Sequence, residues 1–273
     1  GDPAGAPARA QADRAAVLGV LVAPLPPGPA GRWDEAAAIE IELAHGALAS
    51  ASRAEVLGGA HLMAVTGAGG AVEYLQFRTA TLLAARRYRL SGLLRGQFGS
   101  DAAAEAGAPQ GSLGVLIDDR LVRVALSDWD RGTLLDWRAA PAGAAPDGPA
   151  STALSFAATG RALAPWRPCR LHARRSPRGV AESWVRRARR GGDGWAAGEI
   201  ALIDAPEAYR VRIFDGATVK REVQAAEPAW LYPAADEVAD FGGPQTVLVI
   251  EVAQISATHG EGDRLTRVVQ VLL

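Results

Sequence analysis

The stretch that decides the fold is YRVRIFDGATVKREV, residues 209–223. Two strand-like runs, residues 209–214 and 217–223, flank Asp215-Gly216. Asp-Gly is a preferred central pair of a two-residue type I′ turn, in which both residues need positive φ. The stretch therefore predicts a β-hairpin made of residues 209–214 and 217–223.

Further strand patterns surround this hairpin. One strand begins near Cys169, a second covers residues 180–187 and contains Trp184, and two long apolar runs cover residues 247–256 and 265–273. This makes about seven short strands after residue 164, with no helix expected among them. The second half of the chain therefore reads as a β-sandwich.

The first half is also rich in strand patterns. They cover residues 39–43, 61–66, 71–78, 88–93, 115–118, 121–126 and 152–157. A short helix is expected at residues 101–106, with Ser100 or Asp101 as its N-cap. A loop rich in Pro, Ala and Gly follows at residues 139–150. These patterns predict an all-β domain, and they leave a barrel and a sandwich equally open.

Proline positions suggest the domain organisation. Pro165 and Pro168 bracket a strand entry, where proline is tolerated. We expect a flexible segment at residues 1–12, a β-rich domain at 13–163 and a sandwich at 164–273. Because the chain opens at Gly1 with a Pro/Ala/Gly-rich run, we interpret it as a piece of a longer protein.

Composition limits the possible functions. The chain has 273 residues, 49% of them hydrophobic, and a formal net charge of -1, which gives no overall attraction to nucleic acid or anionic lipid. Cys169 is the single cysteine, so neither an internal disulfide nor a cysteine metal site is expected. No apolar run approaches the roughly 20 residues of a membrane helix, and no signal peptide is evident.

The second half resembles a fibronectin type III module. The resemblance rests on Trp184, the Asp215-Gly216 hairpin and the run VIEVAQIS at residues 249–256, followed by Gly260-Glu261-Gly262. It implies a core of Trp184 between two sheets, packed against Val211, Ile213, Leu248, Ile250 and Val252. Glu182 departs from the pattern, because such modules place a branched aliphatic residue there. Either the register is shifted by one residue or the strand edge is exposed.

A second resemblance covers nearly the whole chain. YRLSGLLRGQFGS at residues 88–100, with the segments at 160–165, 183–187 and 239–243, resembles the C-terminal region of the phage tail and gene transfer agent baseplate multidomain proteins. The resemblance implies a virion component at the tail tip, assembled in the bacterial cytoplasm as a homo-oligomer. It also implies contacts with other baseplate or tail hub proteins, and a part in host envelope contact or channel closure.

Eight residues are candidates for interaction. Tryptophan anchors protein interfaces and also stacks on sugars, and arginine contacts phosphates. The candidates are Trp129, Trp137, Trp195 and Trp230, with the basic cluster of Arg186, Arg187, Arg189 and Arg190. DNA contact is expected only if the arginines line a channel; otherwise they form a solvated strand end.

Enzymatic and metal sites are not expected. A glycosidase needs two carboxyl groups facing each other across a cleft, one with a raised pKa. The available carboxylates are close in sequence: Asp118/Asp119, Asp128/Asp130/Asp136 and Asp236/Glu237. Asp128–Gly132 lacks the ligand spacing of an EF-hand. We therefore predict a structural, non-enzymatic protein without a cofactor, the alternatives being a carbohydrate-binding module for host glycan and a glycoside hydrolase fragment.

Overall fold

The computed structural model describes residues 7–191 and 200–271, and the protein is all-β. The chain divides into two compact units, Gly1–Gly160 and Arg161–Leu273. The expected boundary between residues 163 and 164 falls just inside the second unit. Each unit has its own hydrophobic core, so each is described by itself.

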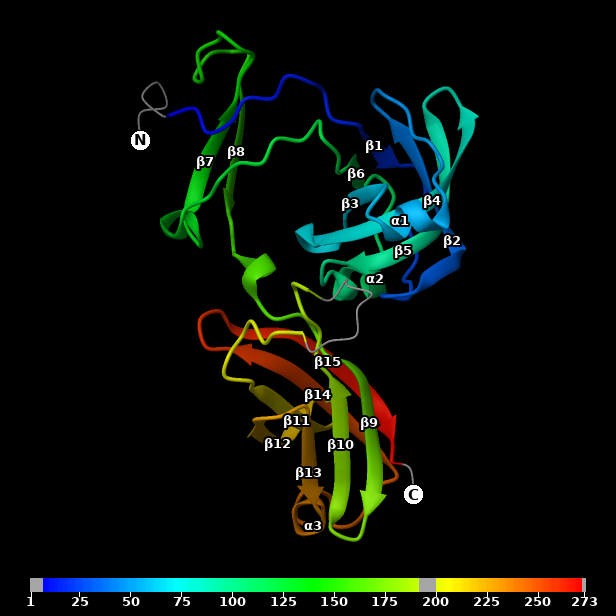
Figure 1. Cartoon of the computed structure of the whole chain (residues 1–273), viewed down its shortest axis with the longest axis vertical. Coiled ribbons are helices and arrows are strands. Elements are labelled where there is room, and N and C mark those ends of the chain that lie inside the picture. The colour runs from blue at the N-terminus through cyan, green and yellow to red at the C-terminus, as the bar shows by residue number, and fades with distance from the viewer. Residues whose placement is uncertain (1–6, 192–199, 272–273) are drawn as a thin grey trace. The chain divides into compact units, whose positions relative to one another are not determined.

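The first unit contains a closed six-stranded barrel (Figure 1), which decides between the two architectures that the sequence left open. Neighbouring strands pair antiparallel in the order β1-β2-β5-β4-β3-β6, and β6 closes the barrel by pairing with β1. The strands are β1 (Leu18–Leu21), β2 (Trp33–Leu43), β3 (Leu62–Thr66), β4 (Val72–Ala84), β5 (Arg87–Gln97) and β6 (Leu113–Leu116). Closure leaves the barrel without an unpaired sheet edge.

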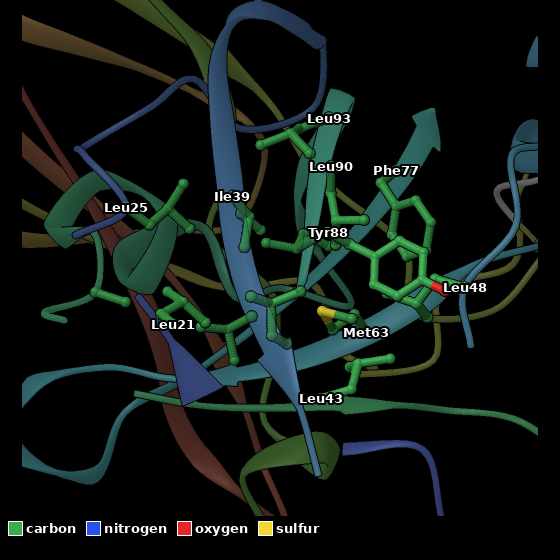
Figure 2. Packing of buried hydrophobic residues seen from close by; sticks show 14 of the residues in the cluster. Leu21, Leu25, Ile39, Leu43, Leu48, Met63, Phe77, Tyr88, Leu90 and Leu93 are labelled. Carbon is green, nitrogen blue, oxygen red and sulfur yellow. The ribbon is translucent and has the colours of Figure 1, made fainter. Parts of the chain in front are cut away.

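Apolar side chains fill the barrel interior. Figure 2 shows Leu21, Ile39, Met63, Phe77 and Leu90 converging from different strands, and all five are almost completely buried. A barrel of this size is just wide enough for its own side chains to fill. The interior is therefore a packed core.

The face that β5 turns inward changes halfway along the strand. Tyr88 and Leu90 are buried, and so are Leu93 and Arg95, which stand at odd instead of even positions. Gly92 lies between the two pairs with φ of 63°, and the pairing of β2 with β5 shifts register at the same point. Gly92 lies within β5, where it redirects Arg95 into the interior.

Two short helices border the barrel. α1 (Arg53–Leu57) begins with a capping box between Ser52 and Glu55. α2 (Asp101–Ala106) has the predicted bounds, with Ser100 at its N-cap. The Ser100 hydroxyl makes no capping bond and instead accepts from the Tyr74 backbone N–H at 2.9 Å.

The strand predicted at residues 121–126 is wrong, because this segment is irregular in the structure. Its apolar side chains are exposed, and no described strand pairs with it. An alternating pattern forms a strand only where a partner accepts its backbone hydrogen bonds. The chain then forms a separate hairpin of β7 (Leu134–Ala139) and β8 (Thr152–Ala157), so the predicted loop at 139–150 lies at the hairpin tip.

The second unit is a β-sandwich, in which a three-stranded sheet (β13-β10-β9) faces a four-stranded sheet (β12-β11-β14-β15) (Figure 1). The strands are β9 (Cys169–Ser176), β10 (Gly179–Val185), β11 (Tyr209–Asp215), β12 (Thr218–Ala225), β13 (Ala229–Pro233), β14 (Val247–Ser256) and β15 (Gly260–Gln270). The expectation of no helix here is wrong, because α3 (Ala234–Phe241) connects β13 to β14.

The predicted sandwich core is confirmed. Trp184 is buried with Val211, Ile213 and Leu248, and its ring meets that of Tyr209 edge to face, with 5.2 Å between centroids. Both explanations offered for Glu182 are wrong. It lies on the same inner face of β10 as Trp184 and is only 2% exposed, so a carboxyl group is buried in the core.

The hairpin that decided the fold forms as predicted, but its turn lies one residue later. Asp215 pairs with Thr218, so the two turn residues are Gly216 and Ala217. Only Gly216 has positive φ, at 58°. A type I′ turn needs two such residues, so that part of the prediction is wrong; a glycine in the first position is what a type II′ turn requires.

Candidate docking surface

The hairpin of β7 and β8 is a two-stranded sheet on its own. Among the strands that the structure describes, β7 pairs only with β8. An isolated two-stranded hairpin is marginally stable in water and usually needs a further strand or a covering layer. Within the described residues, neither strand shares a sheet with the barrel.

One face of this hairpin is apolar. Leu135 lies opposite Phe156, and Trp137 lies opposite Leu154, so these four side chains share a face. We call them the hairpin surface. The opposite face carries Leu134 and the polar cross-strand pair of Asp136 and Ser155, whose side chains are hydrogen-bonded.

The hairpin surface remains accessible. Leu154 is 61% exposed and Phe156 42%, whereas Leu135 and Trp137 are half-buried. The rings of Trp137 and Phe156 stack, with centroids 5.4 Å apart and an interplanar angle of 17°. Contiguous exposed apolar side chains of this kind are typical of protein interaction sites.

A rigid turn at the base of the hairpin presents another tryptophan. Trp129 is 91% exposed, on the single-turn 3₁₀ helix η3 (Asp128–Asp130). Asp130 fixes this turn by accepting from the Ser127 backbone N–H at 2.8 Å and from Arg9 at 3.1 Å. The Ser127 backbone hydrogen bond, followed by that from Arg9, lowers the pKa of Asp130. The turn is therefore held by hydrogen bonds to Asp130 from within the chain.

The candidate tryptophans fall in different parts of the chain. Trp129 and Trp137 belong to the first unit, with no ring contact between them among the described residues. Trp230 packs in the sandwich core, with its ring stacked 5.4 Å from that of Tyr232. Trp195 lies outside the described residues.

Three of the four candidate arginines contact other parts of the second unit. Arg186 donates to the Ile200 carbonyl, and Arg187 lies over the Trp166 ring at 5.3 Å. Arg189 forms an ion pair with Asp204 at 2.8 Å, and both side chains are largely buried. Arg190 is exposed. These contacts fix the chain after β10, so DNA contact by this cluster gains no structural support and stays a prediction.

The carboxylates considered for hydrolysis have partners within the chain. Asp118 pairs with Arg120, Asp119 with Arg14, Asp128 with Arg131, Asp236 with Arg221 and Glu237 with Arg175. Burial raises the pKa of Glu182 to about 8, but this carboxyl lies in the sandwich core. No group of three potential metal-ligating side chains occurs in the described ranges, and no helix there is long and apolar enough to span a membrane.

Sequence reasoning found only Trp137 of the hairpin surface. It predicted the strand at residues 152–157 but missed its partner at 134–139, so Leu135, Leu154 and Phe156 were not recognised as candidates. The available signal was the alternation of large apolar residues in both strands. This alternation covers few residues, and which side chains share a face depends on how the two strands are paired.

A family model matches the barrel. Residues 16–115 match the model of a family described as Rcc01698-like, C-terminal, a name associated with gene transfer agents. The matched segment covers β1 to β5 and all of β6 but its last residue, and it ends before the hairpin. No curated protein matches the chain.

Proposed function

We propose that this chain is a structural component of the tail tip of a phage-like particle of the gene transfer agent type, where it docks to other tail proteins. The observation that carries the proposal is the hairpin surface, on which Leu154 and Phe156 are exposed beside the half-buried Trp137 on a two-stranded sheet. Burying this face against a tail protein would supply the layer that the hairpin lacks.

The barrel supports the proposal that the chain belongs to a phage-like particle. It is the part of the chain that matches a family whose name is associated with gene transfer agents. Its interior is closed and filled by side chains such as Phe77 and Leu90. A barrel of this kind is a rigid support for a protruding hairpin, and its packed interior has no room for a substrate.

A structural role is also supported by the state of the acidic side chains. Hydrolysis by paired carboxylates needs one free base and one carboxyl with raised pKa across a shared cleft. In the described residues, every candidate carboxylate except Asp136 forms an ion pair with an arginine. The pKa of Glu237 is lowered, because hydrogen bonds from Arg175 and Gln245 outweigh the effect of burial. These contacts favour docking over catalysis.

The proposal is tested by removing the hairpin surface. The double variant Trp137→Ser, Leu154→Ser makes this face polar. We expect particles assembled with the variant to contain much less of the chain than particles assembled with the unchanged protein, measured by quantitative mass spectrometry of purified tails. The matched control is Leu134→Ser, a 70% exposed leucine on the opposite face of β7.

The control should be incorporated normally, because the hairpin surface is intact. Circular dichroism of each isolated variant verifies that the barrel and sandwich remain folded. Normal incorporation of the folded double variant would refute docking through this face.

A further inference from the structure

Residues 121–126, LVRVAL, have the pattern of a strand but no partner among the strands that the structure describes. The large apolar side chains of this segment are each between 37% and 44% exposed, namely Leu121, Val122, Val124 and Leu126. Exposed apolar side chains that follow one another so closely are typical of surfaces that another protein covers. The segment therefore has the side chains of a buried strand without the burial.

The backbone of this segment is unpaired as well. The Leu121 N–H donates to the Asp118 carbonyl at 3.2 Å, but the backbone of residues 122–126 makes no hydrogen bond with any described residue. Exposed backbone groups of this kind bond to water until a second strand is available. Free backbone groups combined with an apolar pattern suit the segment to pairing with the edge of a sheet.

Both ends of the segment are fixed by arginines from the N-terminal part of the chain. Arg14 donates to the Asp119 carbonyl at 3.0 Å and to the Asp119 carboxylate at 3.2 Å. Arg9 donates to the Asp130 carboxylate at 3.1 Å. Because both ends are attached, the segment loses less conformational entropy on binding than a free chain would.

The order of the side chains describes the partner that would fit. In an extended strand, Val122, Val124 and Leu126 point to one face and Arg123 points to the other. Arg123 is exposed and has no ion-pair partner in the part of the chain that the structure describes. The fitting partner therefore has an open sheet edge with an apolar groove on one side of it and a wet surface on the other.

We propose that residues 122–126 add as a strand to an open sheet edge of another tail protein, with Val122, Val124 and Leu126 in an apolar groove beside that edge. The barrel of the same unit is closed and offers no edge, and neither β7 nor β8 pairs with the segment. The inference rests on the proposed docking role. It adds a backbone contact that is separate from the hairpin surface.

Proline substitutions test the pairing, because proline has no N–H. In a strand at a sheet edge, the N–H groups of alternate residues face the neighbouring strand, and proline is tolerated where the N–H faces away. The variants are Val122→Pro, Arg123→Pro, Val124→Pro and Ala125→Pro. We expect the two variants of one parity to be incorporated into tails at least about fivefold less than their references, and the other two normally.

The reference for each proline variant is alanine at the same position, which separates the loss of the N–H from the loss of the side chain. These references are Val122→Ala, Arg123→Ala and Val124→Ala, and the unchanged protein serves for Ala125. Incorporation is measured by quantitative mass spectrometry of purified tails. Circular dichroism of the isolated variants should be unchanged, because none of these N–H groups is bonded within the described chain.

A photo-crosslinker identifies the partner. With p-benzoylphenylalanine in place of Arg123, irradiation of assembled tails should link the segment to a strand of a different tail protein. The proposal is overturned by crosslinks to this chain alone, by equal effects of proline at all four positions, or by proline variants that are incorporated like their references.

The results separate this inference from the proposed function. If the hairpin-surface variant is excluded from particles while every proline variant is incorporated like its reference, the strand proposal fails and docking through the hairpin stands. If the proline effects alternate while the hairpin-surface variant is incorporated normally, docking through the hairpin fails and the strand proposal stands.

Discussion

Arg95 joins three segments of the first unit inside the protein. It is 0% exposed, and it donates to both carboxylate oxygens of Glu73 at 2.9 and 2.7 Å. It also donates to the carbonyls of Pro26 and Ala104, at 2.6 and 3.2 Å. Every donor group is directed at an acceptor, which is the condition under which a buried charge is tolerated.

Replacing Arg95 should strongly destabilise the first unit. Arg95→Met leaves the Glu73 carboxylate buried without its partner, and we expect the free energy of unfolding to fall by about 3–5 kcal/mol. Urea denaturation followed by tryptophan fluorescence measures the change. Arg89→Met, at an exposed position of the same strand, should change stability little. A loss below about 1 kcal/mol for Arg95→Met would contradict the assigned role.

Glu182 makes the stability of the sandwich depend on pH. Burial raises its pKa from 4.5 to about 8, and neither carboxylate oxygen has a hydrogen-bond partner among the described residues. Between these two values the folded protein keeps a proton that the unfolded chain releases. The free energy of unfolding therefore falls as pH rises through this window, by up to about 1.4 kcal/mol per pH unit from this group.

The contribution of Glu182 to this pH dependence is isolated by comparison with Glu182→Gln, whose side chain cannot ionise. Relative to this variant, the unchanged protein should lose stability between pH 5 and pH 8 in urea denaturation. Other titrating groups contribute equally to both proteins and cancel in the difference. Identical pH dependence of the two proteins would show that Glu182 does not titrate as described.

At the scale of elements, Gly96 links β5 to the turn that follows β1. It has φ of 65°, and a Cβ there would lie 2.6 Å from the Cβ of Ala30. Gly96→Ala should therefore destabilise the barrel both by backbone strain and by steric overlap. Gly111 is the matched control, since it has φ of 83° and open space where a Cβ would stand.

We expect Gly96→Ala to lower the midpoint of thermal unfolding by clearly more than Gly111→Ala, because only the first change adds a clash. Backbone strain alone costs about 1 kcal/mol, and overpacking adds about 1–3 kcal/mol. Equal shifts for the two variants would mean that Ala30 moves aside without cost.

The sequence predicted elements best where pattern and pairing agree. Residues 247–256 form β14 with the expected bounds, and residues 101–106 form α2. The failure at 121–126 has the opposite cause, because an alternating stretch without a partner strand remains irregular. α3 was missed although its signals are present, namely acidic residues in the first turn and Gly242 in the left-handed conformation at its end.

The candidate site was harder to predict than the fold. Trp137 was identified from its residue type, but the hairpin surface depends on which residues of β7 and β8 lie opposite each other. A shift of one residue would move all four apolar side chains to the other face. The sequence of the long loop between the strands does not set their register. The hairpin surface could therefore be recognised only from the strand pairing in the structure.

At the scale of the whole molecule, the two units combine a packed barrel that carries an uncovered hairpin with a sandwich that has its own core. No group of three potential metal ligands occurs in the described residues of either unit. On the apolar face of the hairpin, Leu154 and Phe156 are exposed. We therefore expect this face to be covered by another protein in the particle.

Hydrogen–deuterium exchange tests this claim most directly, comparing the isolated chain at low concentration with the chain in assembled tails. We predict that backbone amides of β7 and β8 exchange rapidly in the isolated chain and slowly in the tail, because a covered sheet opens less often. The barrel strands should exchange slowly in both. Equally rapid exchange of β7 and β8 in the assembled tail would contradict docking through the hairpin.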